Sequence, residues 1–292
     1  MSRVFYLIKE ELGLFSKKIP YIIITPGLIL LLVFLVLPLI SIIWPTFYDG
    51  AFTLESYTNF FSSSFNLNIL WRTIKVSLIV TVCTIILGLP TAYYISRTNK
   101  KWRSLLMGLV LFPLLTNSVV RSFAWINILG TNGIINQFLL NTGLVSEPLR
   151  MLYTEFAIVI GSVYLFLPLM ITTLVGILEN IDNEMIEAAE TLGANPIVAF
   201  IKVIWPLSIP GVIVGSILVF TGSFTAYTTP QLLGGNQNMM MSTFLYQQAM
   251  SLGNWQNAGV IALIMIVTTV LVMNIFNTLA NMVDRRGGDL NA

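Results

Sequence analysis

The sequence predicts an all-α integral membrane protein with six transmembrane helices, and two observations support this class. Of the 292 residues, 56% are hydrophobic and only 10% are charged, whereas soluble domains carry about 25% charged residues. The apolar residues also gather into long runs. A helix that crosses a bilayer needs roughly 20 mostly apolar residues, and several runs in this chain reach that length.

Six runs are expected to be spanning helices, at 21–43, 74–95, 104–128, 155–178, 205–229 and 257–281. The first run exceeds the roughly 7–15 residues of a signal-peptide core, so we expect it to be a membrane anchor. With no linker or repeat in the chain, one transmembrane domain is expected over 21–282. Residues 1–20 mix apolar and charged side chains at helical spacing, which predicts a cytoplasmic, interfacial segment. Residues 283–292 are expected to form a cytoplasmic tail.

The distribution of Lys and Arg predicts the orientation, because these residues accumulate on the cytoplasmic side. With the N-terminus inside, eleven of the 15 basic residues are cytoplasmic. Four fall at or near the outside: Arg72, Lys75, Arg121 and Arg150. Both termini are therefore expected in the cytoplasm. The uncharged loop at 230–256 is then external, and its Met and Leu residues are candidates to re-enter the membrane interface.

Composition also excludes several classes of function. The net charge of +2 is small and scattered, which argues against nucleic-acid binding. The chain has no histidine, the commonest general base and metal ligand. Its one cysteine, Cys83, cannot form an intramolecular disulfide. We therefore expect no catalytic residue and no metal site, and a membrane-embedded enzyme ranks last among the possible functions.

Residues 181–206 read IDNEMIEAAETLGANPIVAFIKVIWP and hold four of the chain's 13 carboxylates. This acidic segment lies between expected spans four and five. Asp182 is suited to cap a first short helix. Gly193 follows the last periodic residue, where a left-handed C-terminal residue is common. Asn195 and Pro196 then form an N-cap and a first helical position. The segment is therefore predicted to contain two short helices.

The first of these helices is predicted to be amphipathic. One face holds Met185, Ala188, Ala189 and Leu192, and the other holds Glu184, Glu187, Glu190 and Thr191. Alanines at the middle of the apolar face allow another surface to approach closely. Such a helix suits a groove on a partner protein, although a solvated helix that covers the bundle has the same pattern.

At these residues the chain resembles the permease subunits of bacterial ATP-binding-cassette (ABC) importers. The family pattern is Glu-Ala-Ala, three residues, Gly, nine residues, Ile, any residue, Leu-Pro. Residues 187–189 match Glu-Ala-Ala, and Gly193 and Pro206 match at the expected distances. Val203 replaces Ile conservatively, and Trp205 departs from the expected Leu. The departure affects only the distal end of the motif.

The resemblance implies a type I importer permease fold (MetI-like) in a bacterial inner membrane. It identifies the loop at about 180–204 as the coupling loop, which docks on a cytoplasmic ATPase. The coupling residues that it implies are Glu184, Glu187, Ala188, Ala189, Leu192 and Gly193. The implied partners are a second permease subunit, expected to be a different chain, an ATPase dimer, an extracytoplasmic substrate-binding protein and membrane lipid.

Two further stretches resemble the polyamine (spermidine/putrescine) permease group. They are FPLLTNSVVRSFAWINILGTNGIINQFL at 112–139, and the pair PLSIPGVIVGSILVF and TTPQLLGG within 206–235. The resemblance covers about 50–282. It implies that a small polar solute, a polyamine such as spermidine or putrescine, passes through a pathway that this chain helps to form.

The sequence contains no phosphate-binding loop of the form G-x-x-x-x-G-K-[ST]. No Asp or Glu lies inside an expected span, and Glu155 and Glu179 stand at the ends of span four. Ion-coupled transporters usually place such residues at mid-membrane. We therefore expect no cofactor on this chain, with ATP and Mg²⁺ used by the partner ATPase. A stand-alone secondary transporter or channel remains the alternative.

Arg121 is the only charge well inside an expected span. It lies 17 residues beyond Ser104, about 25 Å along a helix, and thus near the outer boundary of the bilayer. It is expected to be an outer-gate residue or a brace for a neighbouring loop. An arginine that snorkels to the interface would have the same position.

Polar and aromatic residues in the outer halves of the spans are the candidates for a translocation path. They are Asn117, Arg121, Trp125, Tyr164, Phe224 and Tyr227. Of the aromatic ones, Trp125, Phe224 and Tyr227 could hold an ammonium group by cation–π attraction. Interhelical packing is the alternative for each residue, and the G-x-x-x-G spacing of Gly211 and Gly215 favours close helix packing.

A tight polyamine site needs carboxylates, and the expected spans supply none. Three explanations stay open. The pathway binds weakly and leaves recognition to the binding protein, a second permease supplies the acids, or the solute is not a polyamine.

Overall fold

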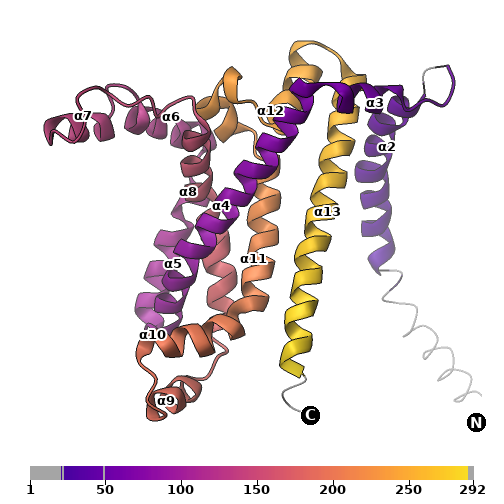
Figure 1. Cartoon of the computed structure of the whole chain (residues 1–292). Coiled ribbons are helices and arrows are strands. Elements are labelled where there is room, and N and C mark those ends of the chain that lie inside the picture. Colours follow the sequence, from indigo (N-terminus) through magenta and orange to yellow (C-terminus); the bar gives the residue numbers. More distant parts are fainter. Residues whose placement is uncertain (1–20, 22, 49, 289–292) are drawn as a thin grey trace, which may run out of the picture.

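The structure, a computed structural model, describes residues 21, 23–48 and 50–288. These residues form a bundle of helices without a β-strand (Figure 1). The α-helices are α2 Leu37–Ile43, α3 Glu55–Ser62, α4 Ser64–Arg97, α5 Lys100–Leu115, α6 Ser118–Leu129, α7 Ile134–Asn141, α8 Glu155–Leu178, α9 Asn183–Thr191, α10 Pro196–Ala199, α11 Trp205–Thr225, α12 Met241–Tyr246 and α13 Trp255–Gly288. Shorter helical pieces are η1 Leu32–Val36, η2 Trp44–Phe47, η3 Phe200–Ile204, η4 Pro230–Gly234, η5 Asn236–Asn238 and η6 Gln247–Ser251. The interfacial segment predicted for 1–20 lies outside the described residues.

The core of the bundle is the three-helix group α4, α8 and α11, which make more extensive contacts with one another than any other described elements do. Met170 of α8 lies between two glycines. A β-carbon at Gly88 of α4 would stand 2.8 Å from Met170 Cγ, and one at Gly215 of α11 would stand 2.6 Å from Met170 Sδ. A β-carbon at Gly211 would likewise meet Ile177 at 2.8 Å. The close packing predicted from the G-x-x-x-G spacing is therefore confirmed.

Five of the six predicted spans are long apolar helices, but the third is not a continuous helix. The chain bends by 93° between α5 and α6. Helix α5 ends at Leu115, and Asn117 caps the start of α6, where its Oδ1 accepts a hydrogen bond from Val119 N at 2.9 Å. Helix α5 has 16 residues, about 24 Å at 1.5 Å per residue. Helices α6 and α7 then extend sideways from the end of the bundle, with α7 farthest from it (Figure 1).

Other span boundaries also differ from the sequence prediction. Helix α4 begins at Ser64 instead of residue 74, and the ends of α11 and α13 differ as well. Helix α11 ends at Thr225 instead of residue 229, so that Tyr227 lies beyond the span. Helix α13 continues to Gly288, through the start of the predicted tail at 283. In each case an apolar run gave the approximate position of the span but not the residue at which the helix begins or ends.

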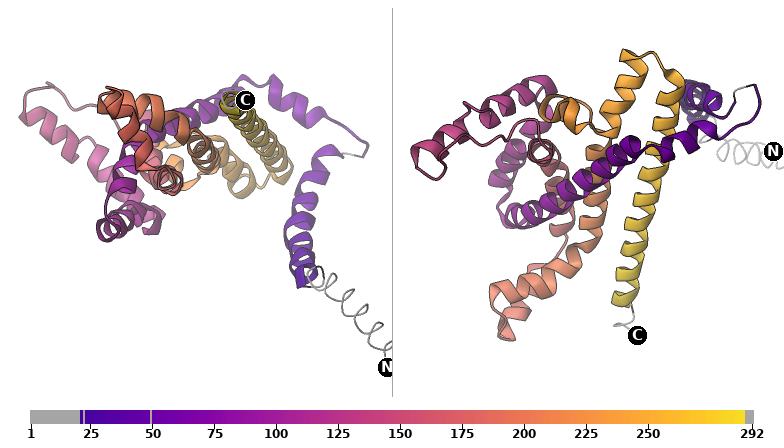
Figure 2. Two further views of the ribbon diagram at one scale, coloured as in Figure 1. Left: turned by 90° about the horizontal axis from the view of Figure 1, so that it is seen from below. Right: turned by 45° about the horizontal axis from the view of Figure 1, so that its top comes forward.

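Helix α2 stands apart from the core group. The helical stretch Ile23–Phe47 has no buried residue in its most apolar window, and the view from below shows it separated from α4, α8 and α11 (Figure 2). Its contacts are near its end. A β-carbon at Gly259 of α13 would lie 2.7 Å from the Ile42 carbonyl oxygen, and the Thr46 and Tyr57 hydroxyls are 2.5 Å apart.

The predicted external loop at 230–256 is folded into the protein. Met240 and Met241 have no exposed surface, and Met241 N donates to Thr73 Oγ1 of α4 at 2.9 Å. Arg72 NH1 also donates to the Met239 carbonyl oxygen at 3.2 Å. These methionines therefore pack inside the bundle instead of at the membrane interface.

Candidate functional site

The acidic segment forms the two short helices that its sequence predicts. Helix α9 spans Asn183–Thr191, and Gly193 follows with φ of +88°, a conformation that glycine adopts without strain. Asn195 Oδ1 accepts from Val198 N at 2.8 Å, and Pro196 is the first residue of α10. Asp182 occupies the N-cap position, but its side chain makes no capping hydrogen bond. The predicted carboxylate cap is therefore wrong in this respect.

Helix α9 projects from one end of the bundle (Figure 1) and leaves its apolar face uncovered. Leu192 is 89% exposed and Met185 is 48% exposed, and Ala188 is also exposed, whereas Ala189 is partly buried. The carboxylates of the opposite face, at Glu184, Glu187 and Glu190, are exposed as well. A helix that covered the bundle would bury its apolar face, so this geometry favours a docking surface.

The base of the acidic segment is fastened to three spans. Arg97 NH1, at the end of α4, donates to the Ile181 carbonyl oxygen at 2.9 Å. Arg103 NH1 of α5 forms an ion pair with Glu179 Oε1 of α8 at 3.1 Å. These anchors were not predicted as functional residues. Their signal in the sequence is the group of basic residues after span two, which also indicates the orientation of the chain.

The aromatic contacts of the same segment strengthen this attachment. The rings of Tyr93 and Phe200 meet edge to face with centroids 5.3 Å apart, and the Arg97 guanidinium lies over Tyr93 at 5.6 Å. Ile186 is the residue of α9 that packs against the core cluster. Short contacts therefore join the acidic segment to α4, α5 and α8.

Arg121 is placed differently from its prediction, because it lies in α6 beyond the bend. The side chain is 8% exposed and turns back to the end of α5. Its NH1 donates to the carbonyl oxygens of Pro113 at 2.8 Å and Thr116 at 3.4 Å. A cationic group at the C-terminus of a helix satisfies carbonyls that lack a partner in the helix. Arg121 thus braces the bend, as one of its two predicted roles required.

The other candidates for a translocation path are scattered over several separate contacts. Trp125 and Tyr164 meet edge to face with ring centroids 5.8 Å apart, and Asn117 is exposed. Phe224 is completely buried and stacks on Phe220, so in this conformation it lines no open path. Tyr227 packs against Tyr246 at 4.7 Å between centroids. The structure does not bring the six residues together.

Comparison with known proteins decides the family. Residues 84–287 match the model of the family described as "Binding-protein-dependent transport system inner membrane component". The chain belongs to this family. It is therefore an inner-membrane, multi-pass permease subunit of a binding-protein-dependent ABC importer. The sequence resemblance to importer permeases is confirmed.

Its relatives in this permease family include the spermidine/putrescine transport system permease protein PotB of Haemophilus influenzae. The two are 34% identical over 240 residues, which cover 82% of this chain and 84% of that protein. PotB of Escherichia coli strain K12 is 33% identical over 210 residues, which cover 72% of this chain and 76% of the relative. The inner membrane ABC transporter permease protein YdcU of the same strain is 28% identical, over 80% of this chain and 81% of that one.

Solved structures confirm the permease fold. The chain matches a bacterial ABC transporter that imports the acidic polysaccharide alginate with a TM-score of 0.73 and 17% identity, over 96% of this chain and 99% of the other. It also matches a bacterial alginate ABC transporter in complex with an alginate pentasaccharide-bound periplasmic protein, with a TM-score of 0.77 and 16% identity, over 92% and 96% of the two chains. At this identity the likeness establishes the fold of the permease.

Proposed function

We propose that this permease subunit forms part of the translocation pathway for a polyamine such as spermidine or putrescine. The observation that supports the solute most directly is the 34% identity to a spermidine/putrescine permease over 82% of the chain. An extracytoplasmic binding protein delivers the solute. A second permease, expected to be a different chain, completes the pathway.

The proposed energy source is an ATPase dimer that docks on α9. The exposed apolar face and exposed carboxylates of α9 support this role, as does the absence of a phosphate-binding loop in the sequence. ATP and Mg²⁺ bind to the ATPase. When its two subunits close, α9 moves, and its anchors at Arg97 and Arg103 carry the motion into α4 and α5. Access then switches from outside to inside by rigid-body movement.

The proposed orientation places α9 and both termini in the cytoplasm. Figure 1 shows the end of α13 on the same side as α9, whereas α3, α6 and α12 lie at the opposite end. The basic residues Arg97, Lys100, Lys101, Arg103 and Lys202 belong to the ends of elements on the α9 side. Together with the basic residues near both termini, they agree with the positive-inside rule.

Cysteine cross-linking tests the docking role. Cys83 is the only cysteine in the sequence and is first replaced by Ala. Ala188→Cys and Leu192→Cys are then introduced on α9, with Leu144→Cys as a matched control, since Leu144 is 69% exposed and follows α7. In the assembled transporter, the α9 variants are expected to cross-link to the ATPase, and the control is not. Cross-links only within this chain or to lipid would contradict the proposal.

Uptake into vesicles tests the solute and the energy source. Vesicles that contain the complete transporter are expected to accumulate labelled putrescine or spermidine only with binding protein outside and ATP inside. Uptake by this chain alone, driven by an ion gradient without ATP, would favour a stand-alone secondary transporter. ATP-driven uptake of a different polar solute would contradict the polyamine assignment and preserve the importer assignment.

A further inference from the structure

A pocket lies at the end of the bundle opposite α9, and its apolar residues belong to the same buried cluster as Phe224. It has a volume of about 310 Å³ and is formed by α3, the start of α4, the α12–η6 segment and the first turns of α13. Pockets that bind small molecules occupy about 300–1,000 Å³, so this one is near the lower limit. Its walls come from two parts of the chain that are distant in the sequence, residues 56–66 and 244–261.

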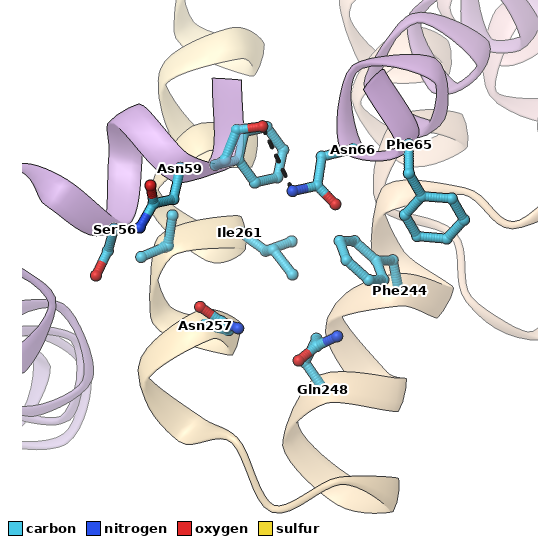
Figure 3. A pocket seen from close by; sticks show the side chains of 10 residues that line it. Ser56, Asn59, Phe65, Asn66, Phe244, Gln248, Asn257 and Ile261 are labelled. Atoms are coloured by element: carbon cyan, nitrogen blue, oxygen red, sulfur yellow. Dashed lines mark hydrogen bonds between the residues drawn. The ribbon is translucent and has the colours of Figure 1, made fainter. Parts of the chain in front are cut away.

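The pocket combines an apolar floor with a rim of side-chain amides. Phe60, Phe244, Val260 and Ile261 are each at most 6% exposed and form the floor. Four amide side chains surround this floor, from Asn59, Asn66, Gln248 and Asn257. Figure 3 shows Asn59 and Asn66 on one side of the pocket and Gln248 and Asn257 on the other, with Ile261 between them.

Most of these amides have no partner within the protein. Among the described residues, the side chains of Asn59, Gln248 and Asn257 make no hydrogen bond, and Asn66 uses only its Nδ2, which donates to the Phe60 carbonyl oxygen at 3.4 Å. The oxygen atoms of all four amides therefore remain available to a donor in the pocket. Each amide oxygen has two lone pairs. Ser56 adds a hydroxyl oxygen at the rim.

The electrostatic character of the pocket favours a cation of low charge density. No Lys or Arg lines it, so there is no like-charge repulsion, and no Asp or Glu lines it either. Phe244 carries an aromatic ring into the floor, where Phe65 meets it edge to face at 5.8 Å. Carbonyl oxygens can replace the hydration of an ammonium group, and an aromatic ring adds a cation–π attraction of about 0.5–2 kcal/mol. The alkyl carbons of such a ligand match the apolar floor.

We infer that this pocket binds the primary ammonium end of a short alkylamine such as a free diamine. The inference rests on the proposed function for the identity of the solute and for the extracytoplasmic position of this end. Without a carboxylate the site is weak. It holds a solute released by the binding protein close to the membrane, while the apolar floor and amide rim keep it from binding too tightly to leave.

Equilibrium binding to the purified full-length chain tests the site. The chain is placed in nanodiscs of phosphatidylcholine, a lipid without net charge that does not attract diamines, and empty nanodiscs provide the background. Labelled putrescine is expected to bind saturably, in the millimolar range. Unlabelled n-butylamine is expected to displace it, since one ammonium group occupies the pocket. Butane-1,4-diol, which has the same length without charge, is not expected to displace it.

Amide-to-leucine variants locate the binding. The double variant Gln248→Leu/Asn257→Leu is expected to raise the Kd for putrescine at least tenfold. Both side chains lack partners among the described residues, so their loss leaves the fold intact, and an unchanged thermal unfolding midpoint checks this. The matched control is Asn127→Leu on α6 at the same end, where the amide bonds only its own helix, at Phe123 O. This control is expected to bind putrescine normally.

Three results would overturn the inference: no saturable binding, displacement by butane-1,4-diol equal to that by n-butylamine, or an unchanged Kd in the double variant. The assay is independent of the uptake experiment. If the complete transporter carries polyamines while the pocket variants bind putrescine normally, the pocket assignment fails and the proposed function stands. If the transporter carries another solute while binding to the chain depends on Gln248 and Asn257, the proposed solute fails and the ammonium pocket stands.

Discussion

Helix α8 carries an acidic residue at each end, and both acids are held by basic side chains from neighbouring helices. Glu155, at the first residue, pairs with Arg72 Nε at 3.2 Å and Lys75 Nζ at 2.5 Å, both from α4. Glu179, after the last residue, pairs with Arg103 of α5 at 3.1 Å. Ion pairs therefore fasten both ends of α8 to neighbouring helices, although the two ends present different surfaces.

The segments that lie next to Glu155 and Glu179 differ in burial. At the Glu155 end, the 230–251 segment returns into the bundle, and Leu233, Met240 and Met241 have no exposed surface. At the Glu179 end, α9 projects outward with Leu192 89% exposed. One end is closed by its own chain and the other offers a surface to a partner. The difference suggests that force enters at the Glu179 end and changes access at the other.

The largest expected effect comes from disrupting the packing of Met170 against Gly88 and Gly215. Met170 lies within α8, between the two ends compared above. Gly215→Leu places a side chain where even a β-carbon would lie 2.6 Å from Met170 Sδ. Overpacking typically costs about 1–3 kcal/mol. The variant is expected to lower the thermal unfolding midpoint of the purified chain and to impair both ends together. The control is Gly176→Leu on α8, where a β-carbon would meet nothing within 4 Å. Equal midpoints for the two variants would refute the packing argument.

Arg121→Gln is expected to affect only the end opposite α9. It removes donors to the carbonyl oxygens of Pro113 and Thr116, and a buried acceptor without a partner costs about 1–3 kcal/mol. The bend between α5 and α6 should loosen, which a spin-label distance across it would report as a broader distribution. Arg150→Gln, at an exposed arginine of the same end, is the control. An unchanged distribution for Arg121→Gln would show that Asn117 alone fixes the bend.

Gly193→Val is expected to affect only the α9 end. The φ of +88° at this position is strained for a residue with a β-carbon, at about 1–2 kcal/mol, although the surrounding space is open. Stimulation of ATP hydrolysis by solute-loaded binding protein should fall at least fivefold in the assembled transporter, and Gly193→Asn should retain most of it, because Asn tolerates this conformation. Gly143→Val imposes the same kind of strain at the other end, where φ is +70°, and should leave the stimulation unchanged. A similar loss from Gly143→Val would indicate a general effect of strain.

The sequence predicted α9 more accurately than the bend in span three, and the reason is physical. The end of α9 and the start of α10 are determined by Gly193, Asn195 and Pro196, whose backbone preferences act locally. The bend also has a local signal, because Asn117 is an N-cap four residues after Pro113. This signal was missed because the residues on both sides of it are apolar. Hydropathy gives the length of an apolar run but not whether the helix changes direction within it.

Contacts between distant segments were beyond prediction from one sequence. The amide pocket needs four elements from residues 56–66 and 244–261 to meet, and no spacing within one helix indicates such a meeting. The burial of Met240 and Met241 likewise depends on Thr73 and Arg72 of α4. The Phe224 ring was read as a candidate cation site from its residue type, but its neighbours place it in the core.

The smallest expected effects compare the two acids of α8 directly. Glu155→Gln weakens two ion pairs and Glu179→Gln weakens one, and each pair between partly exposed side chains is worth about 0.2–1 kcal/mol. Glu155→Gln is therefore expected to lower the unfolding midpoint slightly more. For transport we expect the opposite order, with the larger effect from Glu179→Gln, because Glu179 lies at the base of α9. Glu179→Gln should reduce the stimulated ATP hydrolysis by about twofold, and Glu155→Gln should not.

A double-mutant cycle with Arg103→Gln assigns this loss to the ion pair. If Glu179 acts through Arg103, the double variant should be no worse than either single variant, since additivity fails for residues in contact. Additive losses would mean that the two side chains act separately on α9. Equal losses from Glu155→Gln and Glu179→Gln would mean that both ends of α8 respond to the ATPase alike, and the assignment of the force to the Glu179 end would then be wrong.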